Sequence, residues 1–468
     1  MEQVDKTAKP PLTGSASFRR RAHPLQRRGA GADVMKKRVA IIGAGPMGLA
    51  LASFLEDEAS ISVFEADSQP GGMSASFDFD GVTIEKYYHF ISHSDTHCFD
   101  LLRRLGLAHD LRWRETRMGL LRQNKKGRST LYPWGNPKAL LRLTDIPLIT
   151  RLRYGLHVYA CKFIKDLTLL DDISASAWIS RWEGKKGYDA LWRFLFEKKF
   201  FQLAEPLSAA WIASRIRRVA KSRESLMRGS HGYLEGGYQS LIDHLSERLA
   251  AKGGALHLSR PVARVEIDVN RGGGLVLVGG IPEHFDTVVS TIPLPYLPRL
   301  IPRLPKEYLA KISAIRNIGC RCALFRLGRP LTDNFWLNID MPEWDIPGII
   351  EYSNLRPMRK AYVYMPFYMP HDHPNWRMAD DELLNKARTY LQTINPRAAA
   401  TEEAARLSRY EYAQPLCPPG FRHLLPPYET GARNILAADT THSFPEHRSI
   451  NESVRIAREV ADIVRKSL

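Results

Sequence analysis

A short glycine-rich segment, Gly43-Ala44-Gly45-Pro46-Met47-Gly48, constrains the fold of this 468-residue chain more than any other feature. It follows a continuous apolar run, Val39–Ile42, which is typical of a strand buried on both faces. It opens a segment, Gly45–Leu55, in which apolar residues recur four apart and predict a helix. A strand, a glycine turn and a helix in this order predict the first βα unit of a doubly wound α/β sheet.

The three glycines are expected to have different roles. Gly43 permits the tight turn, Gly45 lets the backbone approach a pyrophosphate, and Gly48 lets the helix pack on the strand. The helix N-terminus offers free N–H groups and partial positive charge to phosphates. Glu65 ends the next expected strand 20 residues after Gly45, where a carboxylate accepts hydrogen bonds from an adenosine ribose and repels the 2′-phosphate of NADP. The pattern therefore predicts a dinucleotide site; a glycine turn without a ligand is the alternative.

Further motifs follow in order along the chain. They are Glu65–Gly72 with its glycine pair, Gly232–Gly237, Pro261–Val265, Asp286–Pro293, Asn434–Asp439 and Arg448–Val454. This series resembles the flavin amine oxidase, protoporphyrinogen oxidase and phytoene desaturase superfamily, and the stretches EKYYHF and FPEHRSINES resemble its bacterial protoporphyrinogen-oxidase-like members. Met73 and Ser74 stand where many members have Arg, and Ala438 stands where Gly is usual. The resemblance implies FAD and a two-lobed α/β fold of the GR2 type, Rossmann-like, with a mixed-sheet and helical substrate lobe.

The resemblance also implies which residues contact FAD. By position in the motifs they are Gly43, Gly45, Pro46, Met47, Gly48, Glu65, Ala66, Gly71, Gly72, Met73, Val262, Val265, Asp439, Ser449, Ile450 and Asn451. Asp439 matches an Asp that contacts the ribityl–phosphate region. Ser449 to Asn451 match the start of a helix whose N-terminus points at the isoalloxazine ring.

Candidate chemistry centres on His89, in Glu85-Lys86-Tyr87-Tyr88-His89, because an imidazole can accept a proton near neutral pH. A histidine that faces the flavin edge without proton transfer is the favoured alternative. The candidate substrate contacts are Tyr88, Tyr364, His447 and Arg448. For His447 and Arg448, the alternative is that they are ordinary surface residues. We expect no metal site, and interpret the Cys320-Arg321-Cys322 pair as core residues.

The expected domains are discontinuous. The FAD lobe comprises 35–96, 227–293 and 410–468, and the substrate lobe comprises 97–226 and 294–409. Residues 1–34 are polar, basic and without periodicity, which predicts a disordered extension, and Met35 is a second candidate start. Asp95–Val219 has a helical, aromatic pattern. We expect most of its Trp and Phe side chains to form a helical core and others to wall an apolar pocket.

The net charge of +17 is consistent with an anionic partner, either a phosphate-bearing substrate or an acidic membrane surface. A solvated basic surface without a partner explains the charge equally well. The sequence has no nucleic-acid-binding motif, so nucleic acid is set aside. Arg151–Leu170 mixes basic and apolar residues, which suits a membrane surface, although packing of a half-buried helix is favoured. Without a secretory signal or a spanning segment, we expect a cytoplasmic protein, with the inner membrane face as a candidate location.

These features predict an FAD-dependent oxidase, dehydrogenase or desaturase. It would transfer hydride to flavin N5 from an apolar or amphiphilic small molecule, such as an isoprenoid or a tetrapyrrole. One alternative is a non-redox isomerase similar to the UDP-sugar mutases, which share the flavin fold. The other is a flavin-binding partner protein without its own activity.

Overall fold

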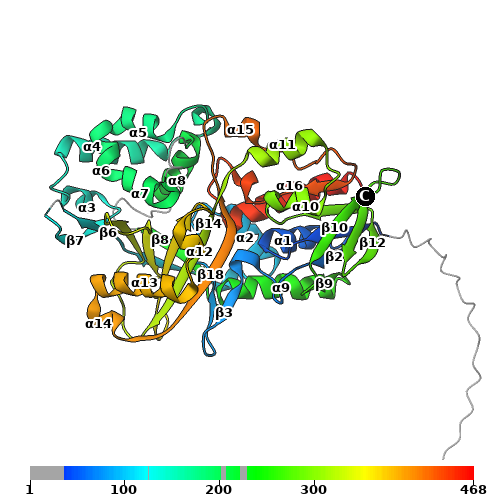
Figure 1. Cartoon of the computed structure of the whole chain (residues 1–468), viewed down its shortest axis with the longest axis horizontal. Coiled ribbons are helices and arrows are strands. Elements are labelled where there is room, and N and C mark those ends of the chain that lie inside the picture. Colours follow the sequence, from blue (N-terminus) through cyan, green and yellow to red (C-terminus); the bar gives the residue numbers. More distant parts are fainter. Residues whose placement is uncertain (1–35, 125, 202–206, 222–228) are drawn as a thin grey trace, which may run out of the picture. The chain divides into compact units, whose positions relative to one another are not determined.

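The computed structural model describes residues 36–124, 126–201, 207–221 and 229–468, and Lys36–Leu468 forms one compact unit. Two expectations lie outside the described residues: the disorder of residues 1–34 and the lobe boundary at 226/227. The described part combines parallel and antiparallel sheets with helices (Figure 1), as the predicted α/β class requires.

A parallel sheet of five strands contains the predicted dinucleotide unit. In spatial order the strands are β19 (Ile435–Ala437), β13 (Thr287–Ser290), β1 (Arg38–Ile42), β2 (Ser60–Phe64) and β9 (Ala255–His257). In β1, Val39 and Ile41 pack into one apolar cluster, whereas Ala40 and Ile42 pack into another on the opposite face. Because both faces are covered, the strand is apolar throughout rather than alternating.

Helices cover one face of this sheet and a small antiparallel sheet covers the other. The helices are α1 (Pro46–Leu55), α2 (Thr96–Arg104), α9 (Gly237–Ala251) and α16 (Ile450–Arg465). The small sheet consists of β10 (Val262–Ile267), β11 (Gly274–Val278) and β12 (Ile281–Phe285). Helix α16 packs directly against α1, so the two ends of the described chain meet beside the predicted dinucleotide turn.

The second large sheet has seven strands. Their spatial order is β18 (Glu402–Pro415), β14 (Asn317–Leu327), β17 (Ala361–Met369), β16 (Gly348–Glu351), β15 (Trp336–Asp340), β6 (Met118–Gln123) and β7 (Ser129–Trp134). In β14, Cys320 and Cys322 face one apolar cluster, and Ala323 and Phe325 face the other. The C-x-C pair is therefore buried in a sheet core, as predicted. Helix α13 (Asp380–Ile394) covers the second face.

A group of helices lies against the first face of this sheet (Figure 1). They are α3 (Pro137–Leu141), α4 (Leu148–Cys161), α5 (Ala175–Glu183), α6 (Lys185–Leu191), α7 (Arg193–Phe200) and α8 (Ala209–Lys221). Trp178, Trp192, Phe194, Phe196, Phe200 and Trp211 are buried in one cluster. The core interpretation is thus confirmed for most of these aromatic residues, although Trp182 is exposed. Shorter helices connect the remaining strands: α10 (Leu297–Leu300), α11 (Lys306–Ala314), α12 (Pro374–Arg377), α14 (Pro396–Ala399) and α15 (Phe421–Leu424).

The expectation of a helical pattern from Asp95 to Val219 was wrong in part, because β5 (Leu111–Thr116), β6 and β7 lie within it. Strand β5 is largely exposed and pairs with β8 (Gly229–Leu234), so it has no apolar alternation to reveal it. Strand β7 is at the sheet edge, where Pro133 is tolerated because its missing N–H faces no neighbour.

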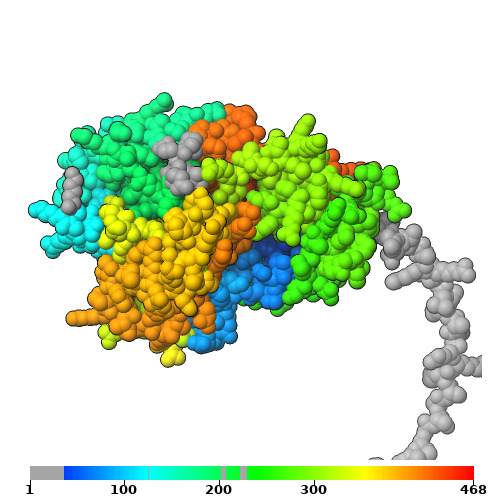
Figure 2. Space-filling model, viewed as in Figure 1, coloured from blue at the N-terminus to red at the C-terminus, as the bar shows by residue number. Residues whose placement is uncertain are grey.

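The predicted hairpin links the two large sheets. Strands β3 (Ser76–Asp78) and β4 (Thr83–Glu85) flank Asp80 and Gly81, which both have positive φ angles, as a type I′ turn requires. Glu85 Oε1 accepts from the Tyr238 amide of α9, and the Phe79 carbonyl accepts from Arg326 of β14. The hairpin, blue in Figure 2, therefore lies between the green and orange regions.

The five-stranded sheet is built wholly from the segments expected for the FAD lobe, whereas β18 of the other sheet crosses the expected boundary at Tyr410. Since Lys36–Leu468 is one compact unit, the division into two lobes stays a prediction.

Candidate functional site

The turn between β1 and α1 leaves the helix N-terminus open. Gly45 is the N-cap residue, with φ −71° and ψ 175°, and no side chain in the described residues caps the helix there. A Cβ atom built on Gly45 would meet no described atom within 4 Å. A Cβ on Gly48, in contrast, would lie 2.0 Å from the Gly43 carbonyl oxygen. The protein itself therefore requires glycine at 48, whereas glycine at 45 keeps the space before the helix free.

The second glycine pair lies against this turn. The Gly71 amide donates to the Ala44 carbonyl at 2.8 Å, and a Cβ on Gly72 would lie 3.6 Å from the Gly45 Cα atom. Glu65 supports the same turn, because its Oε2 atom accepts from the Ala44 amide at 2.8 Å. The two glycine segments thus form one concave backbone surface at the positive end of a helix, which suits a diphosphate.

The carboxyl ends of β13 and β19 are joined by Asp439. Its Oδ1 atom accepts from the Thr441 amide at 2.8 Å, and its Oδ2 atom accepts from the Leu294 amide at 2.9 Å. Helix α16 begins nearby with Ser449 as its N-cap, whose hydroxyl accepts from the Glu452 amide at 3.2 Å. A second helix N-terminus therefore points toward the same region as that of α1.

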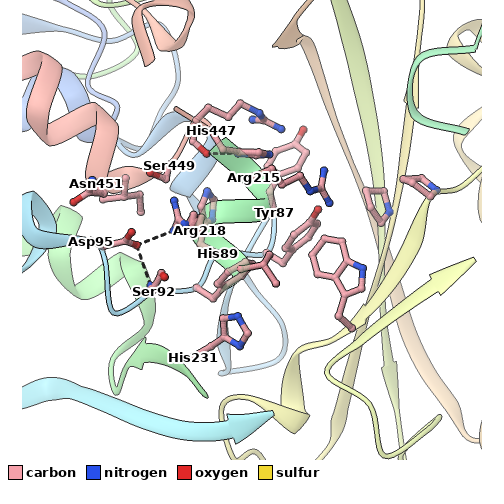
Figure 3. Close-up of a pocket in the computed structure, with 18 of the residues that line it drawn as sticks. Tyr87, His89, Ser92, Asp95, Arg215, Arg218, His231, His447, Ser449 and Asn451 are labelled. Atoms are coloured by element: carbon pink, nitrogen blue, oxygen red, sulfur yellow. Dashed lines mark hydrogen bonds and ion pairs between the residues drawn. The ribbon is translucent and has the colours of Figure 1, made fainter. Parts of the chain in front are cut away.

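A cavity of about 680 Å³ opens in front of these elements (Figure 3). The glycine turns and the start of α16 form one part of its wall. Aromatic side chains form another part: Tyr87, Tyr88, Trp134, Tyr154, Trp192, Trp336, Tyr368, Tyr410 and Tyr412. The cavity therefore combines a backbone cradle with an apolar chamber.

Many of the predicted site residues line this cavity. They are Gly45, Pro46, Met47, Gly72, Met73, Tyr88, His89, Asp439, His447, Arg448, Ser449, Ile450 and Asn451. Within the described residues, the lining does not include Gly43, Gly48, Glu65, Ala66, Gly71, Val262, Val265 or Tyr364. Gly43, Gly48 and Glu65 shape the turn from behind, and Val265 is buried in the core below the sheet. The roles assigned to both groups stay predictions.

Tyr364 lies behind the cavity wall instead of facing a substrate. It is fully buried, its hydroxyl donates to the Glu85 carbonyl at 2.6 Å, and its ring packs edge-on against Tyr88. Tyr368, four residues farther along β17 and on the same face, does reach the cavity. The β3–β4 hairpin packs over the part of β17 that contains Tyr364. This packing could not be predicted from the sequence pattern of the strand.

The environment of His89 weakens it as a base. Burial, aided by the nearby Arg448 charge, lowers the pKa of His89 to about 4. Its Nδ1 atom has no hydrogen-bond partner in the described part of the chain, and its ring packs edge-on against Tyr238. The imidazole is neutral near pH 7 but accepts a proton poorly there, because its conjugate acid is too strong. These observations support the interpretation in which His89 shapes the site without proton transfer.

Sequence reasoning missed several charged residues of the cavity. Lys199, Arg215 and Arg218 line it, and Arg218 pairs with Asp95 (Figure 3). A signal was present for Arg215: it follows the buried Trp211 by four residues, so helical periodicity places it on the apolar face of α8.

The fold and the cavity define an α/β protein of the GR2 type, in which a parallel sheet with a glycine turn adjoins a mixed sheet. The chain belongs to the family of flavin-containing amine oxidoreductases, whose sequence model matches residues 48–465. It is accordingly an FAD-dependent oxidoreductase. No curated protein matches the sequence.

Solved structures of similar fold have low sequence identity. A protein of Exiguobacterium sp. 255-15 that carries the provisional name protoporphyrinogen oxidase has a TM-score of 0.72 at 16% identity, covering 93% of this chain and 100% of that chain. Putrescine oxidase bound to putrescine has a TM-score of 0.70 at 17% identity, covering 92% and 99%. Reduced UDP-galactopyranose mutase has a TM-score of 0.68 at 18% identity, covering 92% and 96%. At these identities the similarity establishes the fold alone.

Proposed function

We propose that this oxidoreductase oxidises an amphiphilic substrate with an apolar body, similar to an isoprenoid or a tetrapyrrole. The observation that carries the proposal is the aromatic chamber beside the glycine cradle. The rings of Trp134 and Tyr154 lie 5.8 Å apart, and those of Tyr154 and Trp192 lie 5.7 Å apart. A row of rings along a cavity of about 680 Å³ suits a long or planar apolar molecule.

The residues around the cradle fit FAD, because the space before Gly45 is free of described atoms and adjoins Gly72. When bound, FAD supplies the hydride acceptor for substrate oxidation. The open N–H groups of α1 would hold the diphosphate, and the N-terminus of α16 directs partial positive charge into the cavity. Tyr88 and His89 line the same cavity and would contact the substrate there.

We also propose that the protein associates peripherally with anionic membranes, in which such a substrate dissolves. None of the helices in the described residues is long and apolar enough to span a bilayer. Helix α4 nevertheless exposes an apolar stripe at helical spacing, which continues past its end. It comprises Ile149, Leu152, Leu156, Tyr159 and Phe163, each more than half exposed. Leu141, Leu148 and Leu169, which flank this segment in the sequence or begin it, are also more than half exposed. An exposed stripe of this size marks an interaction surface.

The charge around the stripe favours an anionic lipid surface as its partner. Segment 137–165 contains six Lys or Arg residues and one Asp. Basic residues beside an apolar helical face are the pattern of helices that lie in the membrane interface. On the opposite side of α4, Tyr154 and Val158 line the cavity. One helix would thus separate the membrane from the substrate chamber.

Vesicle flotation tests the membrane proposal. The double variant Ile149→Ser/Leu156→Ser should lose about 2 kcal/mol of binding to phosphatidylglycerol-containing vesicles, or roughly 30-fold in affinity, because each side chain would bury about half its surface in lipid. The matched control is Val269→Ser/Ile281→Ser, which removes two side chains that are 81% and 73% exposed, one in the turn after β10 and one at the start of β12. Equal vesicle binding by the two double variants would refute the proposal.

Anaerobic reduction tests the enzymatic proposal. Isoprenoid and tetrapyrrole pools are added in turn to the holoprotein, and loss of the visible flavin absorbance is recorded. Bleaching by either pool supports the proposal. Binding of a UDP-sugar to the reduced protein without net flavin turnover would indicate a mutase-like isomerase instead. The third outcome is that neither pool reduces the flavin and that it is also inaccessible to dithionite and oxygen. This outcome would indicate a non-catalytic flavin-binding protein.

A further inference from the structure

Three cationic side chains converge on one side of the cavity. Lys199 lies near the end of α7, Arg215 lies in α8, and Arg448 directly precedes the N-cap of α16. Gln414 Oε1 accepts from Lys199 Nζ at 3.4 Å and from Arg448 Nε at 3.3 Å. Tyr368 joins the group, since its hydroxyl accepts from Arg448 Nη2 at 3.1 Å and its ring centre lies 4.8 Å from Lys199 Nζ.

Two carboxylates near the cluster, those of Asp95 and Glu446, are engaged by other cations. Asp95 Oδ2 lies 2.7 Å from Arg218 Nη2, and Glu446 forms an ion pair with Arg217. No hydrogen bond or ion pair within the described residues engages the guanidinium of Arg215. The described part of the chain likewise supplies no acidic partner for Lys199 or Arg448. Among the residues that the structure describes, the cluster therefore carries unbalanced positive charge.

This arrangement is costly without an anion. Lys199 is only 5% exposed, and burying a cation without an opposite charge is unfavourable. Burial holds the pKa of Lys199 well below its ordinary range, and the charges of Arg215 and Arg448 lower it further. Burial and the same cations also hold the pKa of the neighbouring His447 well below its ordinary range (Figure 3). A bound anion would remove this mutual repulsion.

We infer that Lys199, Arg215 and Arg448 form a binding subsite for an oxyanion, a carboxylate or phosphate group, that the substrate carries. The inference rests on the proposed function and adds to it: the amphiphilic substrate has an acidic end. The diphosphate of FAD does not explain the cluster, because its expected cradle is the backbone at Gly45 and Gly72, whereas Lys199 and Arg215 come from helices that are not part of the cradle.

The subsite also suits the chemistry of its members. Guanidinium groups bind carboxylates and phosphates through paired N–H donors, and a lysine adds a compact charge. Arg448 donates to the Met73 sulfur at 3.3 Å, which places it between the cradle and the other two cations. An oxyanion held there would fix one end of the substrate, while the aromatic chamber receives its apolar body.

Anion titration of the holoprotein tests the inference. Inorganic phosphate, pyrophosphate and acetate are added at constant ionic strength against sodium chloride, and the flavin difference spectrum and thermal midpoint are recorded. At least one oxyanion should change both signals. Arg215→Met should weaken that binding by at least about tenfold, the order expected for one charge-assisted hydrogen bond. Geranyl phosphate and UDP as further probes distinguish a lipid phosphate from a nucleotide.

Two further variants keep the result interpretable. Lys221→Met removes one charge from an exposed position of the same helix and should leave anion binding unchanged. Arg215→Lys retains the charge and should recover part of the affinity. Equal anion binding by the parent and Arg215→Met would overturn the inference, as would loss of FAD from Arg215→Met with anion binding intact. If anion binding depends on Arg215 but no substrate pool reduces the flavin, the subsite is supported and only the oxidase proposal is rejected.

Discussion

Replacing either of two neighbouring glycines with alanine should separate protein stability from cofactor binding. In Gly48→Ala the new Cβ atom would lie 2.0 Å from the Gly43 carbonyl oxygen and 2.9 Å from Thr291 Oγ1, so α1 must shift from β1. Overpacking of this kind should lower the free energy of unfolding by about 3 kcal/mol, with or without FAD.

Gly45→Ala should behave differently. Its backbone angles, φ −71° and ψ 175°, are allowed for alanine, and its Cβ would meet no described atom within 4 Å. The FAD-free protein should therefore be as stable as the parent or more stable by about 0.4–1 kcal/mol, because alanine restricts the unfolded chain. The same methyl group projects into the expected diphosphate space and should weaken FAD binding by at least about tenfold, or 1.4 kcal/mol.

Thermal unfolding at increasing FAD concentration measures both effects, because a ligand that binds the folded state raises the midpoint according to its affinity. The parent midpoint should rise with FAD, and that of Gly45→Ala should begin at or above the parent value and rise less. An identical FAD-dependent rise in Gly45→Ala and the parent would show that the diphosphate does not lie before Gly45, and the assignment of this cradle would be refuted.

Two other predictions concern buried polar groups. Glu183 Oε1 lies 2.6 Å from the buried His157 Nδ1, and Glu183 Oε2 accepts from the Trp192 indole N–H at 2.8 Å. Glu183→Ala leaves both groups without partners and should lower the free energy of unfolding, measured in urea, by about 3 kcal/mol. A loss below about 1 kcal/mol would contradict this expectation. Burial lowers the pKa of His231 to about 4, so the unfolded state binds the proton more readily and stability falls as the pH drops from 6.5 to 4. The thermal midpoint of His231→Gln should therefore decrease less than that of the parent between pH 7 and pH 5, and an equally steep decrease would rule out this contribution.

The sequence predicted those parts of the fold that local signals encode. The apolar run before Gly43, the four-residue spacing after it and the Asp80-Gly81 turn each depend on a few adjacent residues, and each element formed as predicted. Strands β5 and β6 were missed in part because each pairs with a strand far along the chain, β8 and β15 respectively, and the exposed residues of β5 show no alternation.

As with the fold, the parts of the site that could be predicted are those that local motifs encode. Gly45, Gly72 and the start of α16 follow from motifs, and the structure brings them to one cavity. Lys199 and Arg215 were missed because a cation on a helix becomes a cavity residue only through tertiary packing. Tyr364 was assigned to the cavity because strand alternation specifies a face, but not which part of that face the hairpin covers.

The packing of α16 on α1 has a consequence for how the protein matures in the cell. The turn at Gly45 is synthesised early, but the cavity also needs Ser449 and Asn451, and the Asn451 side chain accepts from the Cys98 amide at 3.1 Å. A nascent chain cannot complete this pocket until α16 has left the ribosome. We therefore expect FAD to be incorporated only after α16 has been synthesised and has packed on α1.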